Sequence, residues 1–383
     1  MTNITSNSFT INATALAGTS PLKTYYFSIN GGSSWTTLSS SSTSVSKTIT
    51  GLNANTLYNI KVKVIDTSNY ESNPYSTSVR TANQVLLAIY VKNKYTSQGS
   101  NNLYFHTSSL ANSARDNSYR YAGANPNNYV CFGSDASSCP SNNLYRIIGV
   151  FGSQVKLIKA THVEGMVDWC GNTGSNRVDC KTWSNSYLNN SVLNSTYLNS
   201  LGSTWSNKIS YTTWYTGEVD MQNVLGSNAK TAYNYEIGYN KPSGTTYAKV
   251  GLMYVSEFFY AASSNYWRYP GFGCVNGGMD ENGRCLNTSD YRLAQNNNWL
   301  LSSPTSSNFG QEVLITRFYK PNTAWGTIVG FIHFQNNGSD RGTAFAGSAL
   351  ANNASFYRPA FNLNTNVYYT SGSGTEYDPI RIK

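Results

Sequence analysis

The stretch NLYRIIGVFGSQVKLIKATHV, Asn143 to Val163, contains two apolar runs that meet at Gly152 and Ser153. A glycine followed by a small polar residue between two such runs is typical of a β-hairpin turn. The sequence therefore predicts a strongly apolar β-hairpin over these residues.

Further elements are predicted on the C-terminal side of this hairpin. SNSYLNNSVLNSTYLNSLG has apolar residues at a helical spacing, with Ser184 or Asn185 expected to cap the start and Gly202 the end. KVGLMYVSEFFYAA, residues 249 to 262, fits a strand or a short helix. QEVLITRFYK and WGTIVGFIHFQ are predicted strands, and SGSGTEYDPIRI is a predicted turn with a final short strand.

In the segment NNASFYRPAFNLN, Asn352 to Asn364, every second residue from Pro359 onward is predicted to be buried, which gives one buried parity of the strand. Proline lacks an N–H, so Pro359 suits the edge or the start of a strand. The other parity carries Arg358 between aromatic residues. We expect Arg358 to mark the point where an exposed loop re-enters the core.

The first 83 residues have short alternating strands separated by turn signals, as in a small β-sandwich. Asn30, Gly31 and Gly32 form a predicted hairpin turn. Leu52 and Tyr58, in GLNANTLY, resemble the tyrosine corner of fibronectin type III domains. The resemblance implies a spacer domain over residues 1–83, and the abrupt start at MTNITSNSFTI leads us to expect a truncated first strand. The segment TANQ is the predicted boundary with a second domain over residues 84–383.

Composition narrows the classes of function. Only 12% of the residues are charged, while 14% are aromatic, which favours a β-rich extracellular protein over a cytosolic enzyme. The net charge of +9 comes from scattered residues rather than basic runs, so we expect no nucleic-acid partner. The longest apolar run, Val85 to Val91, is far shorter than the ~20 residues of a membrane helix, so we expect no direct membrane insertion.

The six cysteines are arranged as three close pairs, without the spacing that is typical of zinc sites. Three short disulfide loops are the simplest interpretation and would place the chain outside a reducing cytosol. Free buried thiols and other connectivities remain open. The predicted pairs are Cys131 with Cys139, Cys170 with Cys180, and Cys274 with Cys285.

Five motifs in order, YRIIGVFGSQVKLIK, the VLNSTYLNSL helix, GLMYVSE, WLLSSP and YRPAFNLN, resemble those of secreted proteins from Gram-positive gut bacteria and their phages. The C-terminal module of these proteins is similar to the C-type lectin fold of diversity-generating retroelement variable proteins. The resemblance covers residues 85–383 and implies an α+β C-type lectin-like domain on a bacterial surface or phage particle. It also implies that YRPAFNL closes this domain beside the hairpin, with Arg358 as an ion-pairing or hydrogen-bonding residue.

The sequence contains none of the common hydrolase, nucleotide-binding or metalloprotease motifs. We therefore expect no catalysis, although Glu218 with Asp220, or Glu218 with Glu257, is a conceivable pair of glycosidase carboxylates. The three histidines lie in unrelated elements. We expect no cofactor, and a structural calcium at Asp280, Glu281 and Asn282 is the alternative.

The late strands and their loops carry the predicted ligand-binding residues, because Tyr, Trp and Arg dominate recognition surfaces. We expect a non-catalytic adhesin or receptor-binding protein that recognises a protein or glycan on a cell surface. The alternative is a structural cell-surface or pilus-type component. The candidate binding residues are Asn308, Phe309, Gln311, Arg317, Tyr319, Trp325, His333, Gln335, Arg341 and Tyr357.

Overall fold

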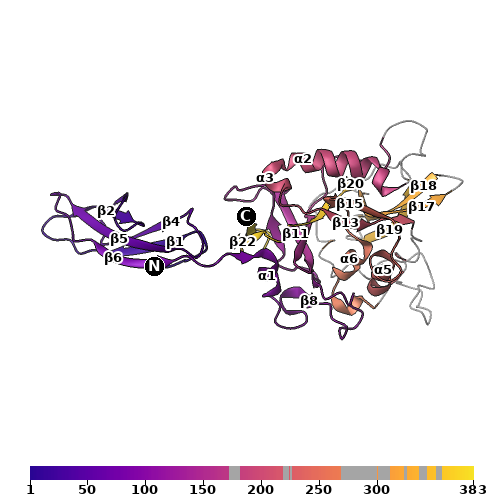
Figure 1. Ribbon diagram of the computed structural model, residues 1–383, viewed down its shortest axis with the longest axis horizontal. Coiled ribbons are helices and arrows are strands. Elements are labelled where there is room, and N and C mark those ends of the chain that lie inside the picture. The colour runs from indigo at the N-terminus through magenta and orange to yellow at the C-terminus, as the bar shows by residue number, and fades with distance from the viewer. Residues whose placement is uncertain are drawn as a thin grey trace. The chain divides into compact units, whose positions relative to one another are not determined.

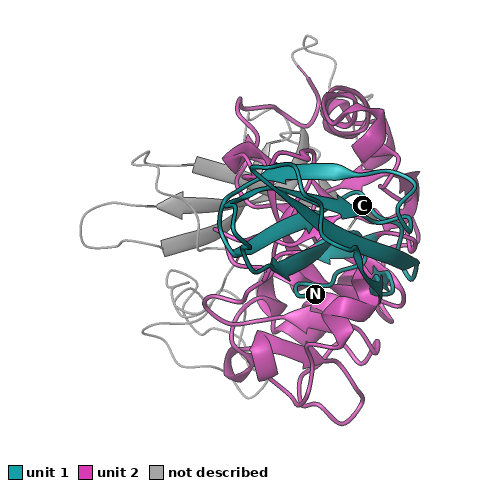
Figure 2. Cartoon of the chain, turned by 90° about the vertical axis from the view of Figure 1, so that its left-hand side faces the viewer, with its two compact units in different colours: residues 1–85, 368–370 teal, residues 86–367, 371–383 magenta. Residues whose placement is uncertain are grey.

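The computed structural model describes residues 1–171, 182–218, 224, 227–268, 300 and 356–383, together with the backbone of three strands between 311 and 350. The chain divides into two compact units, which Figure 2 shows in different colours. Unit 1 comprises Met1–Val85 and Tyr368–Thr370, and unit 2 comprises Leu86–Val367 and Ser371–Lys383. The boundary expected between residues 83 and 84 lies next to this division.

Unit 1 is built from two β-sheets (Figure 1). Phe9, Tyr25, Phe27 and Ile60 form the centre of its apolar core. The predicted turn lies between β2 and β3, where Gly31 and Gly32 have φ angles of 71° and 100° that favour glycine. One sheet pairs β1 (Phe9–Thr14) with β4 (Ser44–Ile49), and the other has the order β3 (Thr36–Ser39), β2 (Leu22–Ser28), β5 (Leu57–Asp66) and β6 (Tyr75–Arg80).

The corner that precedes β5 is closed by Tyr58. Its hydroxyl accepts a hydrogen bond from the backbone N–H of Asn53 at 2.8 Å, while the neighbouring Leu52 is buried. This hydrogen bond joins the loop to the ring of Tyr58, which packs against the core of unit 1.

The predicted hairpin forms the centre of the main sheet of unit 2. Strand β11 (Leu144–Phe151) pairs with β12 (Gln154–Lys159), and Gly152 in the turn has a φ of 61°. The register shifts between Ile147 and Gly149, where a Cβ on Gly149 would lie 2.3 Å from the carbonyl oxygen of Tyr119. Only glycine allows this approach of β9. The other strands of the sheet are β8 (Leu103–Phe105), β9 (Tyr119–Tyr121), β10 (Tyr129–Cys131), β16 (Val250–Gly251) and β21 (Ala360–Asn362).

Strand β21 joins this sheet beside β12, so the expectation that YRPAFNL closes the domain next to the hairpin is confirmed. The expectation of a single buried parity is wrong, because Tyr357 through Leu363 are all buried. Arg358 donates to the carbonyl oxygens of Lys159, Ala160 and Leu300 at 2.9–3.0 Å, which satisfies a guanidinium inside the core. Burial, with the nearby Arg146, lowers the pKa of Arg358 to about 9.

The predicted helix after the hairpin is present, but its start differs from the expectation. Ser184 and Asn185 belong to a preceding 3₁₀ turn, and the hydroxyl of Ser186 instead accepts from the N–H of Asn189 at 3.1 Å. Gly202 follows the end of α2 with a φ of 71°, as expected of a C-terminal glycine, and the short helix α3 begins there. The helical elements here are η3 (Trp183–Asn185), η4 (Leu188–Tyr197), α2 (Leu198–Ser200) and α3 (Gly202–Ser206).

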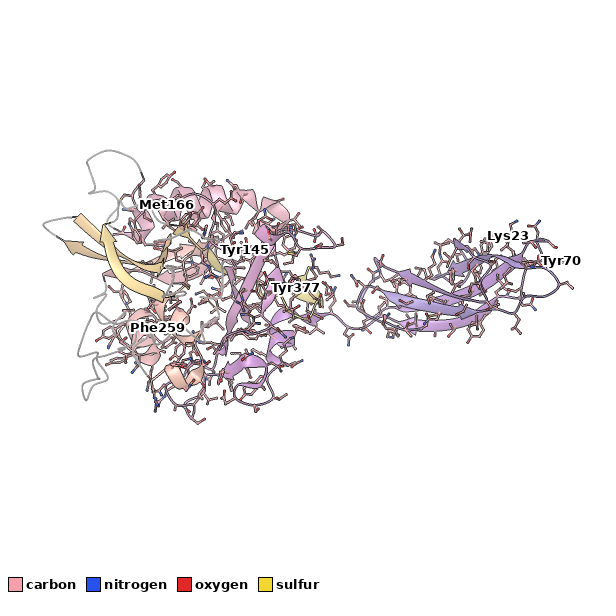
Figure 3. The ribbon with its side chains drawn as sticks, turned by 180° about the vertical axis from the view of Figure 1, so that it is seen from behind. Lys23, Tyr70, Tyr145, Met166, Phe259 and Tyr377 are labelled. Atoms are coloured by element: carbon pink, nitrogen blue, oxygen red, sulfur yellow. A yellow bond between two sulfur atoms is a disulfide. The ribbon has the colours of Figure 1, made fainter. Side chains whose placement is uncertain are left out.

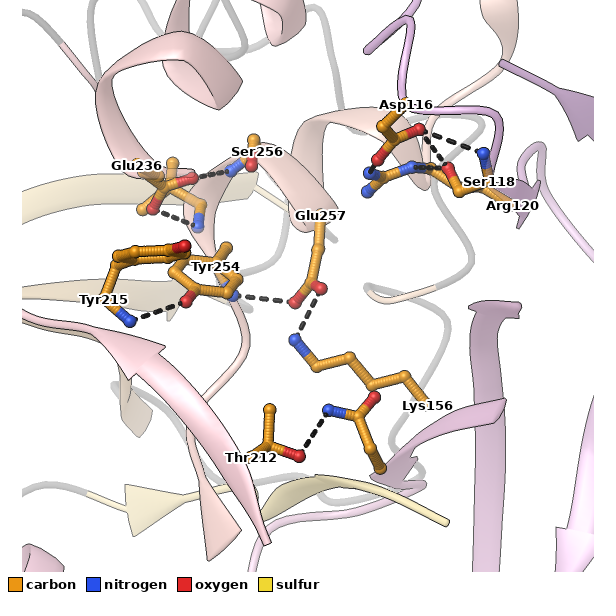
Figure 4. Close-up of polar contacts among 12 residues, drawn as sticks. Asp116, Ser118, Arg120, Lys156, Thr212, Tyr215, Glu236, Tyr254, Ser256 and Glu257 are labelled. Carbon is orange, nitrogen blue, oxygen red and sulfur yellow. Dashed lines mark hydrogen bonds and ion pairs between the residues drawn. The ribbon is translucent and has the colours of Figure 1, made fainter. Parts of the chain in front are cut away.

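The ambiguous segment 249–262 contains both a strand, β16, and a helix, α6 (Val255–Tyr260). Carboxylates accept hydrogen bonds from the backbone N–H groups at the start of α6. The carboxylate of Glu236 accepts from the N–H groups of Val255 and Ser256 at 2.7 Å, and Glu257 accepts from that of Tyr254 at 2.8 Å (Figure 4). Glu236 ends helix α5 (Ala229–Glu236), so these contacts fix α5 against α6.

The remaining elements of unit 2 form small sheets and short helices. A sheet with the order β14–β17–β18–β19, to which β20 adds, contains the two predicted late strands. Its members are β14 (Gly217–Glu218), β17 (Gln311–Asn322), β18 (Gly326–Gln335), β19 (Thr343–Leu350) and β20 (Phe356–Tyr357). The others are β13 (Thr212–Tyr215) with β15 (Thr245–Ala248), α1 (Leu87–Lys92), η1 (Ser100–Asn102), η2 (Ser141–Asn143) and η5 (Ser264–Tyr266). A further sheet has the order β23 (Arg381–Ile382), β22 (Tyr368–Ser371) and β7 (Val85–Leu86), and the division into units falls within β7 and β22.

One predicted disulfide is confirmed, between Cys131 and Cys139, with a Cα–Cα distance of 5.8 Å. Cys170 is also disulfide-bonded. Its expected partner Cys180 lies outside the described residues, as do Cys274 and Cys285, so the other two pairings stay predictions.

A buried ion pair stabilises the end of unit 2 that contains β9. The guanidinium of Arg120, which is only 1% exposed, lies 2.6 Å from the carboxylate of Asp116 and contacts the rings of Phe151 and Tyr260. Burial alone would raise the pKa of Asp116, but Arg120 and hydrogen bonds from Ser118 outweigh it and lower that pKa to about 2. His106 packs on Tyr260 and Trp267, and burial lowers the pKa of this imidazole well below its ordinary value.

The low pKa of Asp116 predicts a specific loss of stability in acid. A carboxylate with a depressed folded-state pKa stabilises the fold above its ordinary pKa and loses that contribution as pH falls through the folded value. We expect Asp116→Asn to lower the free energy of unfolding of unit 2 by about 2 kcal/mol at pH 7, with the difference shrinking between about pH 4 and pH 2. Urea titrations at each pH measure this, with the exposed Asp135→Asn as the control. A pH-independent difference would contradict the assignment.

Candidate functional site

The predicted ligand-binding residues of the late strands are only partly described. Gln311, Arg317 and Tyr319 belong to β17, and His333 and Gln335 belong to β18. Their register is given by the backbone, whereas their side chains lie outside the description. The others that lie outside the described residues are Asn308, Phe309, Trp325 and Arg341.

The register of β17 and β18 separates some of these residues. Gln311 lies opposite Phe334, whereas His333 lies opposite Glu312, so Gln311 and His333 belong to opposite faces of the sheet. Tyr319 lies opposite Val329, toward the other end of the strand pair. At about 3.4 Å of rise per residue, Gln311 and Tyr319 are separated by roughly 25 Å along β17.

Tyr357 is the one predicted ligand-binding residue whose side chain is described. It lies on β20, is 5% exposed, and has a pKa that burial raises. A ring in this position contributes to packing, so an exposed aromatic surface is formed by other residues.

Such a surface lies on β13 and β15, which sequence reasoning missed. Residues Tyr211 to Tyr215 and Thr245 to Lys249 alternate between a buried and an exposed side, which is the period-2 signal of a half-buried strand pair. The inner side contains Trp214, 1% exposed, and Ala248, 7% exposed. We name the outer side the tyrosine face, and it consists of Tyr211, Thr213, Tyr215, Thr245 and Tyr247.

The geometry of the tyrosine face is defined by an exposed ring pair. The rings of Tyr211 and Tyr247 are nearly parallel, with centroids 5.3 Å apart and planes inclined by 19°. Both side chains nevertheless remain 55% and 70% exposed. Large aromatic rings stacked in water, rather than packed into a core, are typical of a recognition surface.

Two lysines border the tyrosine face. The ammonium of Lys249 lies 5.4 Å from the ring centre of Tyr211, and that of Lys241 lies 5.3 Å from the ring centre of Tyr215. Lys249 also donates to the carbonyl oxygen of Ser206 at 2.8 Å, which orients its side chain. The edge of this aromatic surface is therefore cationic.

The inner side of β13 and β15 fixes the tyrosine face to the main sheet. The indole N–H of Trp214 donates to the carbonyl oxygen of Ala248 at 3.1 Å, and a Cβ on Gly251 would lie 2.9 Å from the indole ring. The carboxamide of Asn362, on β21, donates to the hydroxyl of Thr212 at 3.1 Å. A surface that stands on such contacts loses little conformational freedom when it binds.

Among the residues that the sequence suggested for catalysis or calcium binding, the structure describes the side chain of Glu257 alone. Glu257, a conceivable glycosidase carboxylate, is 2% exposed and ion-paired with Lys156, so it cannot reach a substrate in solution. The side chain of Glu218, Asp220 and the proposed calcium ligands Asp280, Glu281 and Asn282 lie outside the described residues. Among the described residues no group of three His, Cys, Asp or Glu side chains is placed to hold a metal ion. The described ranges also contain no helix of the length and apolarity that crossing a bilayer requires.

The two sides of β13 predict opposite effects of truncation. Trp214→Ala removes a fully buried ring and is expected to lower the free energy of unfolding by about 3–5 kcal/mol. Tyr247→Ala removes a ring that is mostly in water and is expected to change it by about 0.5 kcal/mol or less. Urea unfolding of both variants measures this. Equal losses would contradict the assignment of the two sides.

The comparisons with known proteins give no family for this chain. A scan against protein-family models finds no match, and a search of the curated proteins finds none either.

Proposed function

We propose that this chain is a non-catalytic, extracellular ligand-binding protein whose larger unit recognises a glycan on a cell surface. The observation that carries the proposal is the exposed, stacked pair of Tyr211 and Tyr247 on strands fixed by the buried Trp214. Tyrosine combines a large apolar ring with a hydroxyl, so an exposed pair offers both apolar contact area and hydrogen bonds.

A glycan fits this surface for two physical reasons. The faces of aromatic rings carry partial negative charge, so they attract the weakly positive C–H groups that line one side of a sugar ring. The exposed threonines Thr213 and Thr245 lie beside the rings and offer hydroxyl groups that match the polar edges of a sugar.

The charge around the tyrosine face favours an acidic glycan. Lys241 and Lys249 border the rings, and the whole chain has a net charge of +9. Charges at the rim of a binding surface raise the rate of encounter with an oppositely charged partner. We therefore expect the ligand to carry carboxylate or sulfate groups.

The fold assignments belong to the same proposal. Unit 1, with two β-sheets and the Tyr58 corner, is proposed to be a fibronectin type III-like spacer. Unit 2, in which the chain returns beside its own hairpin, is proposed to be a C-type lectin-like domain. The disulfide between Cys131 and Cys139 supports an extracellular location, on a bacterial surface or a phage particle. The late-strand residues Arg317 and Tyr319 remain candidates for a second contact surface.

Binding to an array of immobilised neutral, carboxylated and sulfated oligosaccharides tests the proposal with the full chain. The unchanged protein is expected to bind a subset of acidic oligosaccharides. Tyr247→Ala is expected to weaken that binding by at least ~10-fold, since loss of a central aromatic contact typically costs more than 1 kcal/mol. Lys249→Gln is expected to reduce the binding and its dependence on salt.

A matched control is available in the same unit. Tyr377 is 97% exposed and lies outside the tyrosine face (Figure 3), so Tyr377→Ala should bind like the unchanged protein. Absence of binding to every oligosaccharide, or equal losses for both tyrosine variants, would overturn the proposal. Concentration-dependent self-association that Tyr247→Ala abolishes would instead support the structural, pilus-type alternative.

A further inference from the structure

A buried ion pair beneath the tyrosine face joins the main sheet to helix α6. The ammonium of Lys156, on β12, lies 2.5 Å from the carboxylate of Glu257 (Figure 4). The two side chains are only 5% and 1% exposed. Removing two charges from water is costly, and a buried ion pair by itself adds little stability, so the presence of this pair calls for another explanation.

A carboxamide is placed beside this pair by the sheet register. Lys156 and Asn362 lie directly opposite each other on the antiparallel strands β12 and β21. Directly opposed residues have their Cβ atoms about 5 Å apart and on the same face of the sheet. The flexible stem of a lysine can therefore bring its nitrogen to the Cγ of Asn362.

Aromatic rings and hydrogen bonds surround these buried groups. The ammonium of Lys156 lies 4.9 Å from the ring centre of Trp214 and 4.7 Å from that of Tyr254. Asn362 is 8% exposed, and its amide nitrogen donates to Thr212, which fixes the plane of the carboxamide. The second oxygen of Glu257 accepts from the N–H of Tyr254, which orients the carboxylate toward Lys156.

We propose that Lys156 and Asn362 form an intramolecular amide cross-link, and that Glu257 transfers the protons that this reaction requires. The three groups supply the nucleophile, the electrophilic carbon and the acid–base group of an amide exchange. The register places the amine within reach of the carboxamide, and burial limits the access of water that would compete for it.

The reaction is balanced without an oxidant or another reactant. The ammonium of Lys156 gives a proton to Glu257, and the resulting amine attacks Cγ of Asn362, so that a new C–N bond forms and the carbonyl π electrons move to the oxygen. Glu257 returns a proton to the amide nitrogen as the old C–N bond breaks. The products are a secondary amide between the two side chains and one molecule of ammonia, which leaves as ammonium with the remaining proton.

The cross-link would join two strands that are neighbours in the sheet but far apart in the sequence. A covalent bond between such segments restricts the unfolded chain, as a disulfide does, and the restriction grows with the length of the closed loop. Unlike a disulfide, this bond would not be broken by reductants. It would keep the tyrosine face attached to the sheet under mechanical load.

Lys159 provides a matched comparison on the same strand. It is also buried, but its ammonium donates to the backbone carbonyl oxygen of Asn142. Burial, with the nearby cation Arg358, lowers the pKa of Lys159 to about 8. Since its ammonium contacts a backbone carbonyl rather than a carboxylate–carboxamide pair, Lys159 is not expected to form a cross-link.

Mass spectrometry of the purified full chain, reduced and denatured, tests the proposal. The unchanged protein is expected to be lighter than its sequence requires by one ammonia. Protease digestion should yield a branched peptide that joins the segment containing Lys156 to the segment containing Asn362. A succinimide at an asparagine loses the same mass, so the branched peptide is the deciding observation.

Variants separate the roles of the three residues. Asn362→Ala and Glu257→Gln are expected to restore the full mass, whereas Asn362→Asp should be lighter than its own sequence by one water, because a carboxylic acid releases water instead of ammonia. Lys159→Met should keep the cross-link. The proposal is overturned if the unchanged protein has its full mass and yields no branched peptide. This result does not depend on whether any variant folds. A cross-link that persists in Glu257→Gln overturns the role of Glu257.

Discussion

The pairing of β12 with β21 is the constraint on which the rest of unit 2 depends, because it brings the end of the chain against the central hairpin. Leu157 and Ile158 on β12 lie opposite Phe361 and Ala360, and all of them are fully buried. β16 adds to the other edge of β21, and the side chain of Asn362 reaches β13. The tyrosine face therefore stands on a sheet to which β21 contributes a central strand.

Local signals made part of this architecture predictable. The hairpin at Gly152, the turn at Gly31 and Gly32, and the disulfide between Cys131 and Cys139 each depend on residues that are close in sequence. Features that depend on distant partners were missed or misjudged. Arg358 is buried because three carbonyl oxygens from other segments surround it. The tyrosine face needs Trp214 and Gly251 to define which side of β13 is buried, and nothing within β13 alone reveals this.

The placement of charge separates the structural from the functional groups of unit 2. Arg120, Arg358 and Lys156 are buried, and each interacts with a carboxylate or with carbonyl oxygens. Lys241 and Lys249 instead lie at the border of exposed rings. Charges of the first kind specify one arrangement of the core, whereas those of the second kind remain available to a ligand. This contrast is the physical basis for assigning binding to the tyrosine face.

The central claim is that β21 completes a core from which the tyrosine face derives its rigidity. Native-state hydrogen exchange, followed by mass spectrometry of the full chain, tests it most directly. The account predicts that amides of Leu157, Ile158 and Phe361 exchange together and among the slowest of unit 2, and that those of β13 and β15 become exposed only when this group opens. Fast, independent exchange of β21, with β13 and β15 still protected, would contradict it.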